Sequence, residues 1–315
     1  MRAITGAMPA PTSTVLPRTR NARFDILGVM ADYWALTKPE VNFLIVLTTL
    51  AGFYLGYPAG ERFNFLLLVH TLLGTLLVAS GTATLNQLME RRFDALMHRT
   101  ARRPLPAGRV KPLRAFWFGI LLAAAGGLYL ALEANSLASA LALLTLAAYL
   151  GLYTPMKRRS PFCVLLGAMP GAMPPAIGWA AARGALGLEA WVLCAIVFLW
   201  QFPHFMAIAW MYREDYARAA YLVLPQEGRR GRFVVWQLLL PSVLLIPASI
   251  APIAMSHGGA GYVIGALVLD SAFALYAVRL AFRQSNALAH RLLMASIFYL
   301  PAIFILLMIP KVAQL

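Results

Sequence analysis

Residues 65–85 read FLLLVHTLLGTLLVASGTATL and continue directly into the charged segment NQLMERRFD, residues 86–94. An apolar helix of about 20 residues is long enough to cross the hydrocarbon core of a bilayer. His70 is the only ionisable residue within the apolar run. This stretch therefore predicts a transmembrane helix that ends in a polar segment at one surface of the membrane.

Similar apolar runs follow one another along the chain. With residues 65–85, the predicted spans are 41–57, 114–132, 137–153, 163–182, 189–211, 233–255, 260–282 and 292–310. Of the 315 residues, 61% are hydrophobic and 12% are charged, which is too apolar for a soluble domain. The sequence predicts an all-α fold, a polytopic membrane helical bundle of about nine transmembrane helices. The prolines of the 163–182 run predict a kinked or broken helix that lines a polar cavity.

The distribution of positive charge predicts the orientation in the membrane. With the N-terminus inside, all 27 Lys and Arg except Arg62, Arg183 and Lys311 lie in inner segments, as the positive-inside rule requires. We expect residues 1–30 to be a flexible cytoplasmic tail and residues 31–315 to be the transmembrane domain. Topology thus explains the net charge of +15, and no nucleic-acid partner is expected. A bacterial inner membrane is favoured over a mitochondrial one.

Asn86, Glu90 and Asp94 are spaced four residues apart. On a continuing helix this spacing places three oxygen-bearing side chains along one face. Two carboxylates so placed repel each other unless a cation lies between them. Carboxylate and amide oxygens suit Mg²⁺, which usually completes its octahedron with water and phosphate oxygens. These residues are therefore candidate metal ligands and catalytic residues.

The segment after Asp94 is rich in arginine, and Arg99 and Arg103 are the candidates for binding phosphate. Arginine side chains match phosphate oxygens geometrically. A solvated helix end explains any single arginine equally well, but the combination of an amide, acids and arginines indicates a phosphate site.

Two further inner segments carry charge. In the loop 212–232, Tyr212 and Asp215 are candidates; if the two loops meet, Asp215 could hold a second Mg²⁺ on the other side of a diphosphate. The segment YTPMKRRS, residues 153–160, offers Lys157 and Arg158, which either mark topology or close over the diphosphate.

His204 and Asp270 are two of the ionisable residues that lie within predicted spans. Ionisable groups at membrane depth are usually functional. His204 is either functional or a buried neutral histidine bonded to the backbone. Asp270 needs a partner that the sequence does not identify, so no role is assigned to it.

Four motifs in order resemble the protohaem IX farnesyltransferases, or haem O synthases, of the UbiA superfamily of intramembrane prenyltransferases. They are DYWALTKPEVNFLIVLTT (32–49), NQLMERRFDALMHRTARRPLPAGRV (86–110), YTPMKRRSPFCVLLGAMPGAMPPAIGW (153–179) and WQFPHFMAIAWMYREDYARAAYLVLP (200–225). The runs around Arg99 and His204 favour the haem branch over quinone-directed relatives. Glu90 stands where the family usually has Asp, and Ala220 stands where it usually has Gly.

The resemblance implies transfer of a farnesyl group from farnesyl diphosphate to the 2-vinyl group of protohaem IX (haem B), giving haem O and diphosphate. It implies Mg²⁺ bound near Asn86, Glu90 and Asp94, with Tyr212 and Asp215 as the remnant of a second acidic motif. For His204 it implies contact with haem, as iron ligand or as donor to a propionate. It also implies handover of the product to a haem A synthase or to terminal oxidase assembly. A prenyltransferase acting on 4-hydroxybenzoate or another quinone precursor, and a transporter of anionic substrates, are the alternatives.

Overall fold

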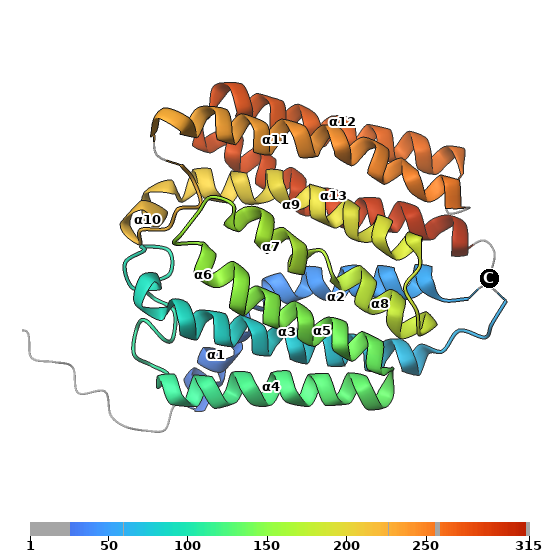
Figure 1. Ribbon diagram of the computed structural model, residues 1–315, viewed down its shortest axis with the longest axis horizontal. Helices are drawn as coiled ribbons and strands as arrows, with labels where there is room; N and C mark the ends of the chain where they lie inside the picture. Colours follow the sequence, from blue (N-terminus) through green and yellow to red (C-terminus); the bar gives the residue numbers. More distant parts are fainter. Residues whose placement is uncertain (1–25, 59, 226, 256–258, 313–315) are drawn as a thin grey trace, which may run out of the picture.

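The chain folds into a bundle of helices. The computed structural model describes residues 26–58, 60–225, 227–255 and 259–312, and within these residues no strand occurs. The elements are α1 (Ile26–Thr37), α2 (Pro39–Gly56), α3 (Phe65–Asp94), α4 (Pro112–Glu133), α5 (Ser136–Ala148), η1 (Tyr149–Tyr153), α6 (Thr154–Met156), α7 (Cys163–Gly171), α8 (Pro174–Arg183), α9 (Leu188–Met211), α10 (Arg213–Arg218), α11 (Glu227–Ile250), η2 (Ala251–Met255), α12 (Ala260–Arg283) and α13 (Asn286–Val312). The long helices run side by side (Figure 1). The predicted all-α bundle is confirmed.

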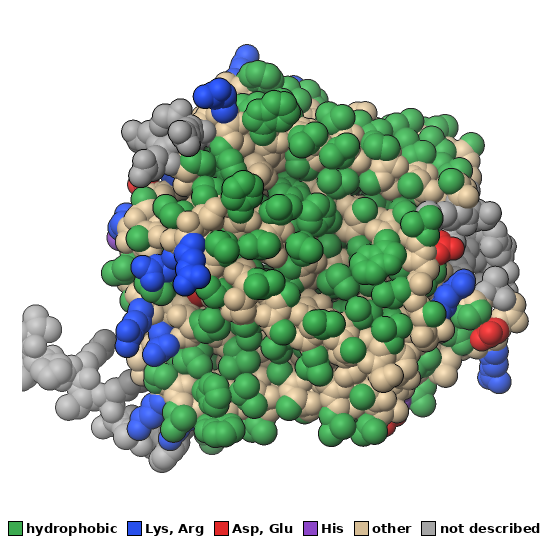
Figure 2. Space-filling model, in the orientation of Figure 1, with side chains coloured by type: hydrophobic (Ala, Val, Ile, Leu, Met, Phe, Trp, Pro, Cys, Tyr) green, Lys and Arg blue, Asp and Glu red, His purple; other side chains and the backbone are tan. Residues whose placement is uncertain are grey.

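Nine helical segments of the described residues are long and apolar enough to cross a bilayer. They are Pro39–Gly56, Phe65–Asp94, Pro112–Glu133, Ser136–Met156, Cys163–Arg183, Leu188–Met211, Gly231–Ala254, Ala260–Arg283 and Asn286–Ile309. Hydrophobic side chains cover the middle of the face shown in Figure 2, and charged side chains gather toward its two ends. The predicted number of spans is confirmed.

Helix α1 precedes the first span and is too short to cross a membrane. Residues 1–25 of the predicted tail lie outside the described residues, and residues 26–30 belong to α1. Leu36 is fully buried, whereas Leu27 and Trp34 are 79% and 66% exposed. One face of α1 therefore packs on the bundle, and another presents apolar side chains outward.

The proline-rich span is broken, as predicted. Helix α7 ends at Gly171, and α8 begins at Pro174. Proline is tolerated at the first position of a helix, because the N–H group that it lacks would have no partner within the helix. Helix α8 then packs closely on α2, because a Cβ on Gly52 would lie 2.1 Å from the carbonyl oxygen of Pro175. The break turns the chain so that α7 packs on α9 while α8 packs on α2.

The span that begins with α5 ends in an irregular turn. Residues Tyr149–Tyr153 form a π-helical turn, η1, which leads into the short helix α6. Such turns are rare and are often found at functional sites. Here the turn brings Lys157 and Arg158 to the end of the bundle where α3 ends and α10 lies (Figure 1).

Asp270 lies on α12 in a buried polar cluster and is 1% exposed. The hydroxyls of Ser249 on α11 and Tyr299 on α13 each donate a hydrogen bond to one of its carboxylate oxygens, at 2.5 Å. Tyr262 donates to the backbone carbonyl of Ser249. The partners that the sequence did not identify are therefore neutral hydroxyls from the two neighbouring helices.

Candidate active site

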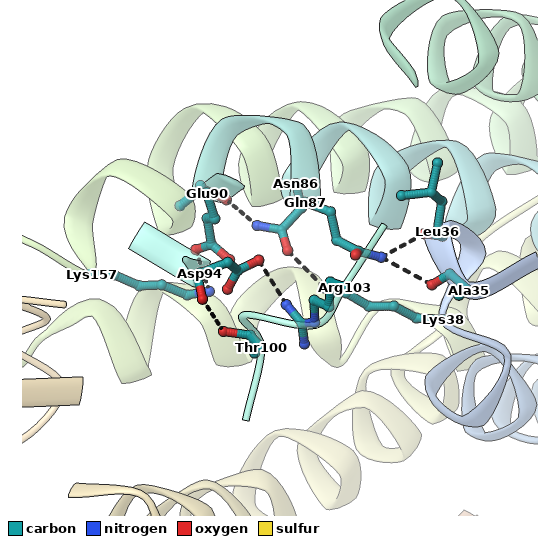
Figure 3. A network of polar contacts seen from close by, with 11 residues as sticks. Ala35, Leu36, Lys38, Asn86, Gln87, Glu90, Asp94, Thr100, Arg103 and Lys157 are labelled. Carbon is teal, nitrogen blue, oxygen red and sulfur yellow. Dashed lines mark hydrogen bonds and ion pairs between the residues drawn. The ribbon is translucent and has the colours of Figure 1, made fainter. Parts of the chain in front are cut away.

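The predicted oxygen ligands lie on the last turns of α3. Asn86, Glu90 and Asp94 are 0%, 6% and 1% exposed, and they project from the same helix end toward the cations of the site (Figure 3). Gln87 secures this helix end, because its amide donates to the carbonyl oxygens of Ala35 at 3.1 Å and Leu36 at 2.9 Å. The predicted helical continuation beyond residue 85 is thus confirmed.

Each acid of α3 is paired with a cation from another segment. Lys157 Nζ lies 2.7 Å from Glu90 Oε1, and Arg103 NH1 lies 2.9 Å from Asp94 Oδ2. These pairs relieve the repulsion between the two buried carboxylates. The other oxygens, Glu90 Oε2 and Asp94 Oδ1, have no polar partner among the described residues.

The segment after α3 folds back on the helix end. Thr100 donates to the backbone carbonyl of Asp94 at 2.8 Å, which places Arg103 beside the Asp94 side chain. Arg109 pairs with Asp32 of α1 at 2.8 Å. The loop is therefore fixed to both α3 and α1.

Asp215 joins the two charged loops. Its oxygens accept hydrogen bonds from the backbone amides of His98 at 3.0 Å and Arg99 at 3.2 Å, and from Arg218. Burial alone would raise the pKa of Asp215, but these donors outweigh burial and lower the pKa below its ordinary value. The structure thus brings the two loops together, with Asp215 as the link between them.

Aromatic rings contact the cations of the site. Arg99 lies over the ring of Tyr212 at 4.7 Å, and Arg158 lies over Phe93 at 4.2 Å. Lys157 lies over Tyr153 at 4.5 Å. Burial alone would lower the pKa of Lys157, but the negative charge of Glu90 and the neighbouring tyrosines raise it well above its ordinary value. The site therefore combines fixed positive charge with aromatic surfaces.

Sequence reasoning missed three residues at this site. Lys38 donates to Asn86 Oδ1 at 2.8 Å, and Asn86 in turn donates to Thr154 at 3.1 Å. Tyr221 is buried beside Lys157, and its hydroxyl has no hydrogen-bond partner within the described part of the chain. Burial and the charge of Arg103 lower the pKa of Lys38 to about 7. Lys38 and Thr154 lie in two of the quoted motifs, but no local spacing connects either of them to Asn86.

The predicted haem contact, His204, lies elsewhere, between α9 and α13. Its Nδ1 is 2.7 Å from the hydroxyl of Ser296, and Trp200 stacks on the ring at 4.7 Å. The Ser296 hydroxyl donates its single proton to the carbonyl of Leu293 at 2.6 Å, so it accepts from His204. With the Ser296 proton on Leu293, Nδ1 is the donor to Ser296, and Nε2, which has no partner among the described residues, keeps a lone pair.

The residues of α3 fit a magnesium ion that is held mainly by water and phosphate. Among the described residues, no group of three or more His, Cys, Asp or Glu side chains could hold a metal, so the protein does not provide a complete cage. However, Mg²⁺ is usually bound by one or two carboxylates together with substrate phosphates. Glu90 Oε2 and Asp94 Oδ1, next to the amide oxygen of Asn86, provide such a partial set.

Comparison with known proteins places the chain in a family. Residues 45–301 match the UbiA prenyltransferase family. The chain belongs to this family. It is 46% identical to the protoheme IX farnesyltransferase of Solibacter usitatus, over 90% of this chain and 99% of that protein. It is 40% identical to the protoheme IX farnesyltransferase of Koribacter versatilis, over 91% and 95% of the two chains. The resemblance that the motifs indicated is confirmed, and the protein is a prenyltransferase.

Solved structures share the fold at low sequence identity. A digeranylgeranylglyceryl phosphate synthase has a TM-score of 0.71 at 16% identity, covering 90% of this chain and 99% of that one. A UbiA homologue from Archaeoglobus fulgidus, bound to GPP and Mg²⁺, has a TM-score of 0.61 at 16% identity, over 88% and 99% of the chains. The chain is thus a multi-pass membrane protein with the architecture of this family.

Proposed function

We propose that the protein transfers the farnesyl group of farnesyl diphosphate to the 2-vinyl group of protohaem IX, giving haem O and diphosphate. The observation that carries this proposal is the buried row of Asn86, Glu90 and Asp94 surrounded by cations from three other segments. The relatives named protoheme IX farnesyltransferase support the choice of substrates.

The chain's own residues would hold the leaving group. Arg99, Arg103, Lys157 and Arg158 supply positive charge toward the diphosphate, and Tyr212 holds Arg99 through its ring. Bound at Asn86, Glu90 and Asp94, Mg²⁺ would neutralise negative charge that develops on the departing diphosphate. Asp215 remains a predicted metal ligand, although its contacts support the role of holding the two loops together. Preorganised charge of this kind usually contributes most of an enzyme's rate enhancement.

The bond changes balance with one molecule of water. The bond between C1 of the farnesyl group and its oxygen breaks, and its electron pair leaves with the diphosphate. The terminal vinyl carbon of haem forms a bond to C1, which leaves a cation on the carbon next to the porphyrin ring. Water adds there and loses a proton, giving the hydroxyethylfarnesyl group. The rings of Tyr153 and Phe93 lie against Lys157 and Arg158, and such cation–π contacts contribute ~0.5–2 kcal/mol each to holding these cations in place for the diphosphate.

His204 is the proposed contact to haem. Because Nδ1 donates to Ser296, Nε2 presents its lone pair, which is the form of histidine that ligates metals. We place the protein in a bacterial inner membrane with its N-terminus in the cytoplasm, and its product passes to a haem A synthase or to terminal oxidase assembly.

The test uses membranes that contain the wild-type chain, supplied with haem B, farnesyl diphosphate and Mg²⁺. We expect haem O by mass spectrometry, loss of product with a magnesium chelator, and no effect of excess 4-hydroxybenzoate. Lys111→Met is the matched control, because Lys111 is an exposed cation at the start of α4. Absence of haem O, or prenylation of 4-hydroxybenzoate instead, would overturn the proposal.

A further inference from the structure

We propose that Lys38, at the junction of α1 and α2, binds the diphosphate of the prenyl donor and is therefore a residue of the substrate site. This inference rests on the proposed function only for the identity of the donor. What it claims is that a further cation, outside the arginine-rich loop and the segment 153–160, contacts the pyrophosphoryl group.

The first support is the position of the ammonium group. Lys38 Nζ donates to Asn86 Oδ1 at 2.8 Å, the first of the three oxygen-bearing side chains on α3. An ammonium group has three donors, and this is the one bond that it makes to the described residues. Figure 3 shows the Lys38 side chain pointing to the same group of residues that Lys157 and Arg103 approach. The remaining donors are therefore available at the place where the phosphates would lie.

The second support is the charge that Lys38 leaves unbalanced. Lys157 is paired with Glu90, and Arg103 is paired with Asp94, but Lys38 has no carboxylate within ion-pair distance among the residues described. When Lys38 is protonated, these three cations and two carboxylates leave one positive charge in excess. Lys38 is partly buried, and burying an unpaired ammonium group is costly. A bound anion removes that cost, and a diphosphate with one magnesium ion carries net negative charge.

The third support is the backbone. Lys38 adopts φ 53° and ψ 64°, in the left-handed region that side chains other than glycine seldom occupy. Strain of this kind is concentrated at functional sites, where the surrounding structure holds it in place. Here the carbonyl of Lys38 accepts from the amides of Val41 and Asn42, each at 3.1 Å, and Asn42 also donates to the carbonyl of Thr37. The corner thus fixes the backbone in a conformation that directs the long side chain to Asn86.

A purely structural role is the alternative: Lys38 would serve only to join the α1–α2 corner to α3. Lys38→Gln separates the two roles, because a glutamine amide can still donate to Asn86 but carries no charge. Lys38→Met removes both the charge and the donor, and Lys38→Arg keeps the charge. Lys111→Met again serves as the exposed control.

The measurements are the dissociation constant of inorganic pyrophosphate with Mg²⁺, the KM values for farnesyl diphosphate and haem B, and the thermal midpoint. For Lys38→Gln and Lys38→Met we expect pyrophosphate affinity and the KM for farnesyl diphosphate to worsen by roughly 10- to 100-fold, the range for a lost hydrogen bond to a charged group. We expect the KM for haem B to stay within about twofold, and Lys38→Arg to recover most of the loss.

Unchanged pyrophosphate affinity in folded Lys38→Gln would overturn the inference, and so would an equal rise in both KM values. The proposed function fails separately, if wild-type protein binds pyrophosphate but makes no haem O. In that outcome a pyrophosphate affinity that depends on Lys38 would still support the site.

Discussion

Two buried acid clusters of this protein satisfy their carboxylates in different ways. At the end of α3, Glu90 and Asp94 face the cations Lys157 and Arg103, and each keeps one oxygen without a partner in the part of the protein that the structure describes. In the bundle of α11, α12 and α13, Asp270 has both of its oxygens occupied by hydroxyls. The first arrangement leaves coordination open to a ligand, whereas the second is closed by the protein itself.

This difference separates a binding site from a structural connection. Buried charge paired with charge is costly to assemble and contributes little net stability, so its retention at the end of α3 is best explained by substrate. Hydrogen bonds from hydroxyls on two neighbouring helices hold three helices together without any ligand. We therefore expect substitutions in the first cluster to change activity and those in the second to change stability.

The largest effect is expected for Asp94→Ala. Removal of this carboxylate takes away a proposed magnesium ligand and leaves Arg103 without its partner. We expect the rate of haem O formation to fall by roughly 10²–10³-fold, the range seen when one group that stabilises a transition state is lost. The rate is taken per folded molecule, because the loss of its partner from Arg103 also lowers the thermal midpoint. Glu61→Gln, in the exposed loop before α3, is the control. An activity of Asp94→Ala within threefold of wild type would contradict the comparison.

For Asp270→Asn we expect the reverse pattern. The amide keeps one acceptor oxygen but puts an N–H donor where the second carboxylate oxygen lay, so the hydrogen bonds of Ser249 and Tyr299 must rearrange, at a cost of about 1–3 kcal/mol. The half-life of the purified protein at elevated temperature should shorten, while the rate per folded molecule stays near that of wild type. A stable but inactive variant would show that Asp270 belongs to the chemistry.

The parts of these clusters that are close in sequence were predictable. The nine spans follow from local hydropathy, and the common face of Asn86, Glu90 and Asp94 follows from helical spacing alone. Lys38, Ser249 and Tyr299 were not predictable as partners, because they reach their acceptors from other helices, and only the packing brings them close. The same holds for Asp215, whose carboxylate accepts from the backbone amides of His98 and Arg99 only because the first loop folds over it.

His204→Ala tests the proposed haem contact with a smaller expected effect. Loss of a ligand at Nε2 should raise the KM for haem B by roughly tenfold, as loss of one hydrogen bond or ligand to a charged group does, and should shift the visible spectrum of bound haem. The KM for farnesyl diphosphate should not change. The control is His290→Ala, because His290 is an exposed histidine on α13. An unchanged haem spectrum in His204→Ala would exclude His204 from the haem site.

The smallest effect is expected for Ala220→Gly, in the loop that Asp215 connects to the first cluster. Ala220 has φ 53°, where a left-handed conformation costs a residue with a Cβ about 1–2 kcal/mol, and the family resemblance places glycine here. Glycine removes this strain but gives the unfolded chain more freedom. We therefore expect a net gain of at most about 1 kcal/mol, seen as slower proteolysis of the loop at unchanged activity. Faster cleavage would show that the contacts of Asp215, not the backbone at residue 220, limit the stability of this loop.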